Sequence, residues 1–196
     1  MLALQGGVRE HADALRRLGA EVRLVRRAAE LDALDGLVLP GGESTTMERL
    51  ARTFDLWDPL RAAVHAGLPV YGTCAGLILL AERIEDGAAG QESLGGLDIT
   101  VRRNAFGRQL DSFEQAVDIA GMDGAALNAV FIRAPLITDL GPDASVIARL
   151  DDGRVVGVRQ GRSLGTAFHP ELTGDDRMHA LFLELVAADA LPGPGR

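Results

Sequence analysis

The stretch Gly72-Thr-Cys-Ala-Gly76 constrains the fold of this chain more than any other. It follows the apolar residues Val70 and Tyr71, and the apolar run Leu77-Ile-Leu-Leu80 follows it at once. A Gly-x-nucleophile-x-Gly pattern between a strand and a helix is typical of a nucleophile elbow, because the glycines let the two backbones approach closely. Its central residue is Cys74, the only cysteine, placed where the helix dipole favours the thiolate. The pattern predicts a thiol nucleophile whose side chain points out of the sheet, although a small cysteine buried beneath a helix would give the same letters.

Expected strands and helices alternate in the first half of the chain. Apolar runs predict strands at 2–5, 21–25, 37–39 and 68–71, and helical spacing predicts helices at 8–18, 47–52, 59–66 and 75–82. We expect Ser44 or Thr45 to cap the second helix and Gly19 to end the first. Such alternation predicts a mostly parallel sheet covered by helices on both faces, which is a three-layer α/β sandwich.

Shorter segments follow from about residue 94, and they alternate apolar and polar residues. Strands are expected at 97–101, 129–132, 145–150, 155–159 and 164–168, with a hairpin turn at 151–154. We expect these strands to be antiparallel and to extend the same sheet. An amphipathic helix is expected over 175–188, and its apolar face would close the core.

Length and composition exclude several classes of protein. The 196 residues, 47% of them apolar, predict one domain over 1–190 and a loose tail at 191–196. No apolar run approaches the roughly 20 residues of a transmembrane helix, and a net charge of −8 argues against a nucleic-acid partner. A single cysteine without a signal peptide predicts a reducing, cytoplasmic location. The histidines and the cysteine show no metal-ligand spacing, so no metal site is expected.

A base for the thiol is expected at His169. It follows the apolar strand 164–168 at its carboxyl end, where ligand sites gather in parallel sheets. Glu171 lies two residues on, across Pro170, and in an extended chain both side chains would point to the same side. His169 between a carboxylate and Cys74 would complete a triad, whereas His-Pro-Glu by itself is also an ordinary polar turn. The other histidines fall within expected helices: His11, His65 and His179.

Acyl transfer to a thiol also needs donors for an oxyanion. The backbone N–H of Ala75, directly after the nucleophile, is one candidate. We expect the second from the glycine-rich turn Pro40-Gly-Gly-Glu-Ser44, at Gly42, because a glycine N–H can face a site without a Cβ clash. The same turn is equally well explained as a tight connection into a helix, and the two interpretations are compatible.

Taken together, these motifs resemble the class I (triad) glutamine amidotransferases, and more closely the glutaminase subunits of pyridoxal 5′-phosphate synthase. The resemblance rests on Leu4-Gln-Gly-Gly-Val-Arg-Glu-His11, Leu39-Pro-Gly-Gly-Glu-Ser-Thr-Thr-Met47, Gly72-Thr-Cys-Ala-Gly76, Arg103-Asn-Ala-Phe-Gly-Arg-Gln-Leu-Asp-Ser-Phe113, Phe131-Ile-Arg-Ala-Pro135 and Phe168-His-Pro-Glu-Leu-Thr173. It implies a flavodoxin-like fold. The family usually has a few more apolar residues ahead of the Leu-Gln-Gly block, so we expect either a short first strand here or a true start upstream of Met1.

The resemblance also implies roles for individual residues. Cys74 would be the nucleophile, His169 the general base and acid, and Glu171 the residue that orients His169. The residues that would contact L-glutamine are Gly42, Glu43, Ser44, Arg103, Ile132 and Arg133. Amide hydrolysis needs no cofactor. The ammonia would pass through a channel to a separate barrel-fold synthase subunit, which we expect to dock on the face around Cys74 and residues 5–11.

Three alternatives remain open from the sequence. A different triad amidotransferase could feed another synthase, although the blocks at 103–113 and 131–135 argue against it. A regulatory binding module could use Cys74 as a redox sensor, although the presence of His169 and Glu171 argues against that. A cysteine peptidase is a weaker alternative, because the turn at 40–44 suits a small amino acid better than a polypeptide.

Overall fold

The computed structural model describes residues 1–103 and 112–188. The middle of the 103–113 block and the expected tail at 191–196 therefore lie outside the described residues. None of the helices in these two ranges is both long and apolar enough to span a membrane.

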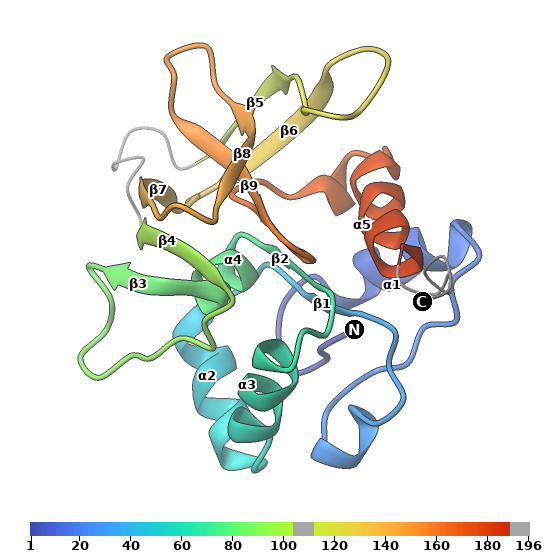
Figure 1. The fold of residues 1–196 in the computed structure, drawn as a ribbon, viewed down its shortest axis with the longest axis vertical. Coiled ribbons are helices and arrows are strands. Elements are labelled where there is room, and N and C mark those ends of the chain that lie inside the picture. Colours follow the sequence, from blue (N-terminus) through green and yellow to red (C-terminus); the bar gives the residue numbers. More distant parts are fainter. Residues whose placement is uncertain (104–111, 189–196) are drawn as a thin grey trace, which may run out of the picture.

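A mixed sheet forms the centre of the molecule (Figure 1). Its strands run in the order β1 (Leu37–Leu39), β2 (Val70–Thr73), β10 (Ser163–Thr166), β9 (Val155–Gln160), β7 (Leu136–Leu140), β4 (Leu97–Arg102) and β3 (Ala81–Glu85), and β8 (Ser145–Arg149) pairs with β9. The strands β1, β2 and β10 are parallel, whereas β9 is antiparallel to β10. The carboxyl ends of β1, β2 and β10 therefore meet at one edge, which is where ligand sites form in such sheets.

Helices cover both faces of this sheet, as the alternation of elements predicted (Figure 1). On one side, α1 (Val8–Arg17) lies against α5 (Arg177–Ala187), and on the other side α2 (Ser44–Thr53) contacts α3 (Trp57–His65) and α4 (Ala75–Leu80). Two short 3-10 helices, η1 and η2, span Ala28–Glu30 and Pro170–Leu172. The large buried side chains Tyr71, Phe131 and Phe168 belong to one core cluster within the described chain.

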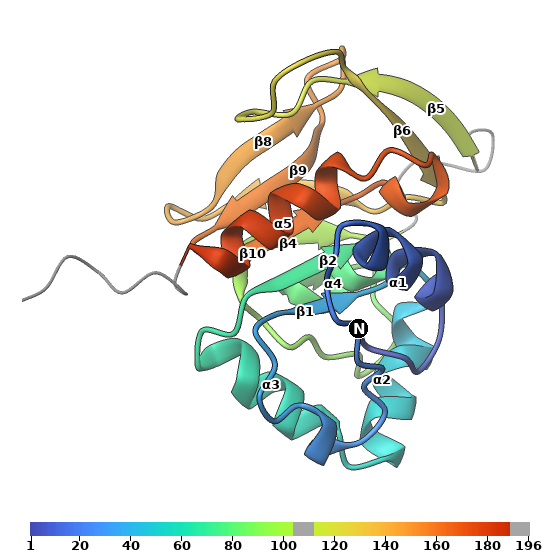
Figure 2. The same ribbon diagram turned by 90° about the vertical axis from the view of Figure 1, so that its right-hand side faces the viewer.

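The antiparallel strands of the second half divide between two sheets. β8 and β9 form the expected hairpin around 151–154 and extend the central sheet. β5 (Ser112–Val117) and β6 (Leu127–Ile132) form a separate two-stranded sheet, which Figure 2 shows beyond α5. The expectation that all of the predicted strands continue one sheet is therefore wrong for β6, and β5 was not predicted.

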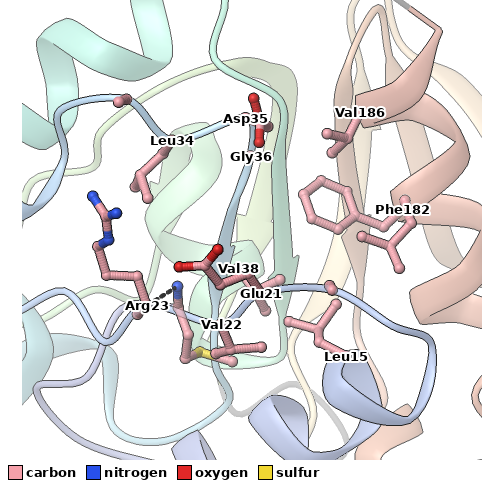
Figure 3. Close-up of a pocket in the computed structure, with 14 residues that line it drawn as sticks. Leu15, Glu21, Val22, Arg23, Leu34, Asp35, Gly36, Val38, Phe182 and Val186 are labelled. Carbon is pink, nitrogen blue, oxygen red and sulfur yellow. Dashed lines mark hydrogen bonds between the residues drawn. The ribbon is translucent and has the colours of Figure 1, made fainter. Parts of the chain in front are cut away.

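The segments 2–5 and 21–25 do not form the expected strands. They are joined by an isolated parallel bridge between Leu2 and Val25, and the Ala3 N–H donates to the Val25 carbonyl at 2.8 Å. Beyond this bridge lies a cavity of about 250 Å³, lined by Val22, Val38 and Phe182 among others (Figure 3). In the described structure the pairing of these two segments is limited to this bridge, which is too short to make a ladder.

Several element boundaries differ from the expected ones. α2 begins at Ser44 and its cap is Glu43, whose carboxylate accepts from the backbone N–H groups of Thr45 and Thr46. Neither Ser44 nor Thr45 is the cap, because both already lie in the helix. α4 ends at Leu80, and β3 begins with the next residue. Gly19 follows α1 with φ of 86°, as expected of a helix-ending glycine.

Candidate active site

The nucleophile elbow forms where β2 passes into α4. Cys74 lies between them with φ of 48° and ψ of −100°, a conformation that non-glycine residues rarely adopt. The glycines allow the close approach that the pattern predicts: a Cβ on Gly76 would overlap the Leu39 carbonyl of β1. The Cys74 N–H donates to the Thr166 carbonyl of β10 at 2.8 Å, so the elbow is bonded to the strand that leads to His169.

His169 and Glu171 meet as predicted, but through a different backbone geometry. His169 Nδ1 lies 2.8 Å from Glu171 Oε1. The contact is made across the 3-10 turn η2, with Pro170 as its first residue, and the chain is not extended there. Proline suits the first position of a helical turn because its missing N–H has no partner to lose. This turn leaves His169 Nε2 available to a group other than Glu171.

Burial and charge set the protonation of this pair. Burial alone would lower the pKa of His169, but its interactions with Cys74 and Glu171 outweigh burial and raise that pKa to about 10. For Glu171, burial would raise the pKa, yet the hydrogen bond from His169 and the electrostatic interactions with His11 and His169 together outweigh burial and lower the pKa. A protonated imidazole beside an ionised carboxylate is therefore the favoured state at neutral pH.

The expected site residues, except for Ala75, line one cavity of about 460 Å³. Its lining includes Gly42, Glu43, Ser44, Cys74, Arg103, Ile132, Arg133, His169 and Glu171. Ala75 is the first residue of α4, is buried, and does not belong to the described lining of this cavity. Cys74 Sγ lies 4.0 Å from the Ile132 carbonyl oxygen.

Charged groups of both signs stand at this cavity. Arg103 Nη2 donates to Glu43 Oε1 at 2.8 Å, and Arg103 Nη1 donates to Gln91 Oε1 at 2.7 Å. Arg133 is exposed, has φ of 44°, and makes no hydrogen bond or ion pair within the described residues. A small zwitterion would thus find both a carboxylate and guanidinium groups here.

The sequence did not indicate several residues that shape the site. Gln5 Oε1 accepts the Glu43 N–H at 2.7 Å, and the Gly7 N–H donates to the Gly41 carbonyl at 3.0 Å. These bonds hold the 5–7 turn against the glycine-rich turn after β1. In the sequence, only the Leu4-Gln-Gly-Gly7 block pointed to these residues. That block was part of the family resemblance, but the resemblance implied no contact for Gln5.

The cavity beside Met1 offers no comparable chemistry. It is lined mainly by apolar side chains, with Glu21, Arg23 and Asp35 as its charged residues (Figure 3). No thiol, hydroxyl or imidazole belongs to its described lining. Of these two cavities, only the one around Cys74 is lined by a thiol and an imidazole within the described residues.

The chain is similar to proteins of one known family. Residues 1–188 match the model of the SNO glutamine amidotransferase family. Two similar proteins are each named pyridoxal 5′-phosphate synthase subunit PdxT. The one from Acidothermus cellulolyticus is 60% identical over 97% of this chain and 94% of its own chain. The one from Nocardioides sp. is 58% identical over 96% of each chain. A solved structure described as a glutamine amidotransferase is 49% identical and superposes with a TM-score of 0.88 over 95% of this chain and 97% of its own.

Proposed function

The chain belongs to the SNO glutamine amidotransferase family, and on that premise we propose that it hydrolyses L-glutamine with Cys74 as the nucleophile. The products are L-glutamate and ammonia, and the ammonia serves pyridoxal 5′-phosphate synthesis, the activity named for its relatives. One observation carries the proposal: a single cavity contains the elbow thiol, the His169–Glu171 pair and charges that fit an amino acid.

The reaction proceeds through a thioester. The Cys74 thiolate attacks the side-chain amide carbon of glutamine, and the imidazolium of His169 gives its proton to the departing ammonia. A water molecule then gives a proton to His169 and attacks the thioester carbon, which releases glutamate and restores the thiolate. Glu171 holds the imidazole ring in place through both steps. The N–H groups of Ala75 and Gly42 are the proposed donors to the oxyanion.

Substrate recognition is assigned to the charged rim of the cavity. The α-ammonium group of glutamine pairs with the Glu43 carboxylate, and its α-carboxylate pairs with the guanidinium of Arg103 or Arg133. Gly42, Ser44 and Ile132 complete the pocket. The existing bond of 2.8 Å between Arg103 and Glu43 means that the two side chains already lie within reach of one small ligand.

The glutaminase works with a synthase subunit, as the names of its relatives state. We propose that this partner is the barrel-fold subunit, that it docks on the face around Cys74 and residues 5–11, and that it receives ammonia through a channel. The sequence contains no lysine, so any imine chemistry on sugar phosphates has to take place on the partner. A cytoplasmic location belongs to this proposal, because Cys74 acts only when it is reduced.

The test is glutamate release from L-glutamine by the purified chain, with and without the synthase subunit and with Cys74→Ala as the control. We expect strong stimulation by the partner and no release from the variant. If the synthase subunit does not change the rate of glutamate release, the thiol chemistry still holds, but the pairing with this synthase is overturned. Equal release from Cys74→Ala would overturn the assignment of the nucleophile.

A further inference from the structure

A buried pair of histidines lies directly behind the Glu171 carboxylate. His11 belongs to α1 and His179 to α5, and both are 0% exposed. His11 Nδ1 lies 2.8 Å from His179 Nε2, although 168 positions separate the two residues in the sequence. Neither histidine lines the cavity around Cys74 within the described chain, so neither is placed to touch a substrate.

The other nitrogen of His11 faces two parts of the proposed catalytic machinery. His11 Nε2 lies 3.3 Å from Glu171 Oε2 and 3.0 Å from the hydroxyl oxygen of Thr73, the residue before Cys74. Glu171 Oε1 is already bonded to His169, whereas Oε2 is fully buried and has no hydrogen bond in the described structure; its contact with His11 Nε2 is a charge contact at 3.3 Å. A carboxylate oxygen removed from water is costly without a donor, and His11 Nε2 is the group that offers one.

The charges around His11 decide where its proton sits. Burial lowers the pKa of His11 to about 4, so the ring is neutral at pH 7 and carries one N–H. A lone pair on Nε2 would face an ionised carboxylate oxygen and be repelled, so the proton belongs on Nε2. Nδ1 then accepts from His179 Nε2–H, and the unbonded His179 Nδ1 carries only a lone pair. With this tautomer, the His11 Nε2–H lies within reach of both Glu171 Oε2 and the Thr73 hydroxyl oxygen.

We propose that His11, oriented by His179, is a positioning residue that holds Glu171 Oε2 so that Oε1 stays on His169. This inference rests on the proposed function, because it assigns the pair a task in the same reaction. The carboxylate would otherwise be fixed by a single contact and free to rotate about its last bond. His11 also contacts Thr73, so the ring ties the carboxylate to the strand that ends in the nucleophile.

The matched variants are His11→Gln and His11→Leu. The amide nitrogen of glutamine reaches about as far as the imidazole Nε2, so His11→Gln keeps a donor for Glu171, whereas His11→Leu has a similar size and no donor. Glutaminase kinetics are measured on the complex with the synthase subunit. We expect His11→Leu to lose about tenfold or more in kcat with KM nearly unchanged, since small misplacements of catalytic groups cost rate rather than binding. His11→Gln should recover most of the loss, and His65→Leu on α3 is the control that should not change kcat.

Two results would overturn the proposal: a folded His11→Leu variant with the kcat of the unaltered chain, or a His11→Gln variant no faster than His11→Leu. If His11→Leu fails to fold, nitrogen NMR of the unaltered, histidine-labelled chain gives a second readout. A proton on His11 Nε2 supports the inference, and a proton on Nδ1 refutes it. The NMR result is independent of turnover, whereas an unaltered complex that releases no glutamate refutes the proposed function itself.

Discussion

Replacing Cys74 by glycine should make the fold more stable than replacing it by alanine. At this position φ is 48° and ψ is −100°, which lies outside even the left-handed region that some non-glycine residues visit. Any side chain with a Cβ is strained here, and glycine is not. The two variants both lack the thiol, so their difference isolates the backbone strain of the elbow from the chemistry.

The size of the effect follows from three opposing contributions. Backbone strain of this kind costs about 1–3 kcal/mol, and we expect the upper part of that range because both dihedral angles are unfavourable. Glycine loses about 0.5–1 kcal/mol through the larger freedom of the unfolded chain. Removal of the buried Cβ costs roughly 0.8 kcal/mol more. The glycine variant should therefore exceed the alanine variant by about 1 kcal/mol, or ~2–4 °C in melting temperature for a chain of this size.

Equilibrium unfolding in urea measures this difference directly. Ala62→Gly on the exposed side of α3 is the matched control, and there glycine should lower the free energy of unfolding by about 1 kcal/mol. The same chemical change should thus have opposite signs at the two sites. A Cys74→Gly variant no more stable than Cys74→Ala would refute the claim that the elbow is strained.

Three further predictions concern the cavity and the residues behind it. Gly41→Ala should lower glutaminase activity by about 100-fold in steady-state assays, because the new Cβ would overlap the His169 ring and displace it. Arg103→Ala should raise KM for glutamine by about tenfold with a smaller effect on kcat, because it removes one positive charge from the cavity and leaves the Glu43 carboxylate without its ion-pair partner. An unchanged KM would exclude Arg103 from binding glutamine. The free energy of unfolding should fall as the pH drops from 6.5 to about 4, because the pKa of His11 is lower in the folded chain and the unfolded chain takes up the proton first. Denaturation at several pH values should show a weaker dependence for His11→Gln, and an identical dependence would contradict the assignment.

Local patterns in the sequence were sufficient to predict the elbow and the His169–Glu171 contact. Both depend on residues a few positions apart: the glycines permit the close backbone approach of the elbow, and the proline fixes its own φ beside His169. The α/β fold with helices on both sheet faces was also predicted correctly, because its strands and helices alternate with clear periodicity. The catalytic and binding roles assigned to these residues stay predictions until they are tested.

Contacts between distant segments could not be predicted in the same way. The His11–His179 pair joins two helices from opposite ends of the chain, and in each helix the histidine looks like an ordinary member of a buried face. The segments expected as strands at 2–5 and 21–25 have the apolar pattern of strands, yet they pair only through the single bridge between Leu2 and Val25. The cap of α2 was misassigned because Glu43 competes for the same N–H groups through a longer side chain.

The bond between the Cys74 N–H and the Thr166 carbonyl limits how this subunit can be regulated. The nucleophile directly follows β2 and the base follows β10, and these neighbouring strands pair in register up to Thr73 and Thr166. Such a ladder is rigid, so the distance between the Cys74 thiol and the His169 imidazole can change little when the activity is regulated. A partner that switches the activity on, as proposed, has to act on the turns at 40–43 and 132–133 instead. These turns contain Gly41 and Gly42, which tolerate many backbone conformations, and Arg133, whose φ is 44°.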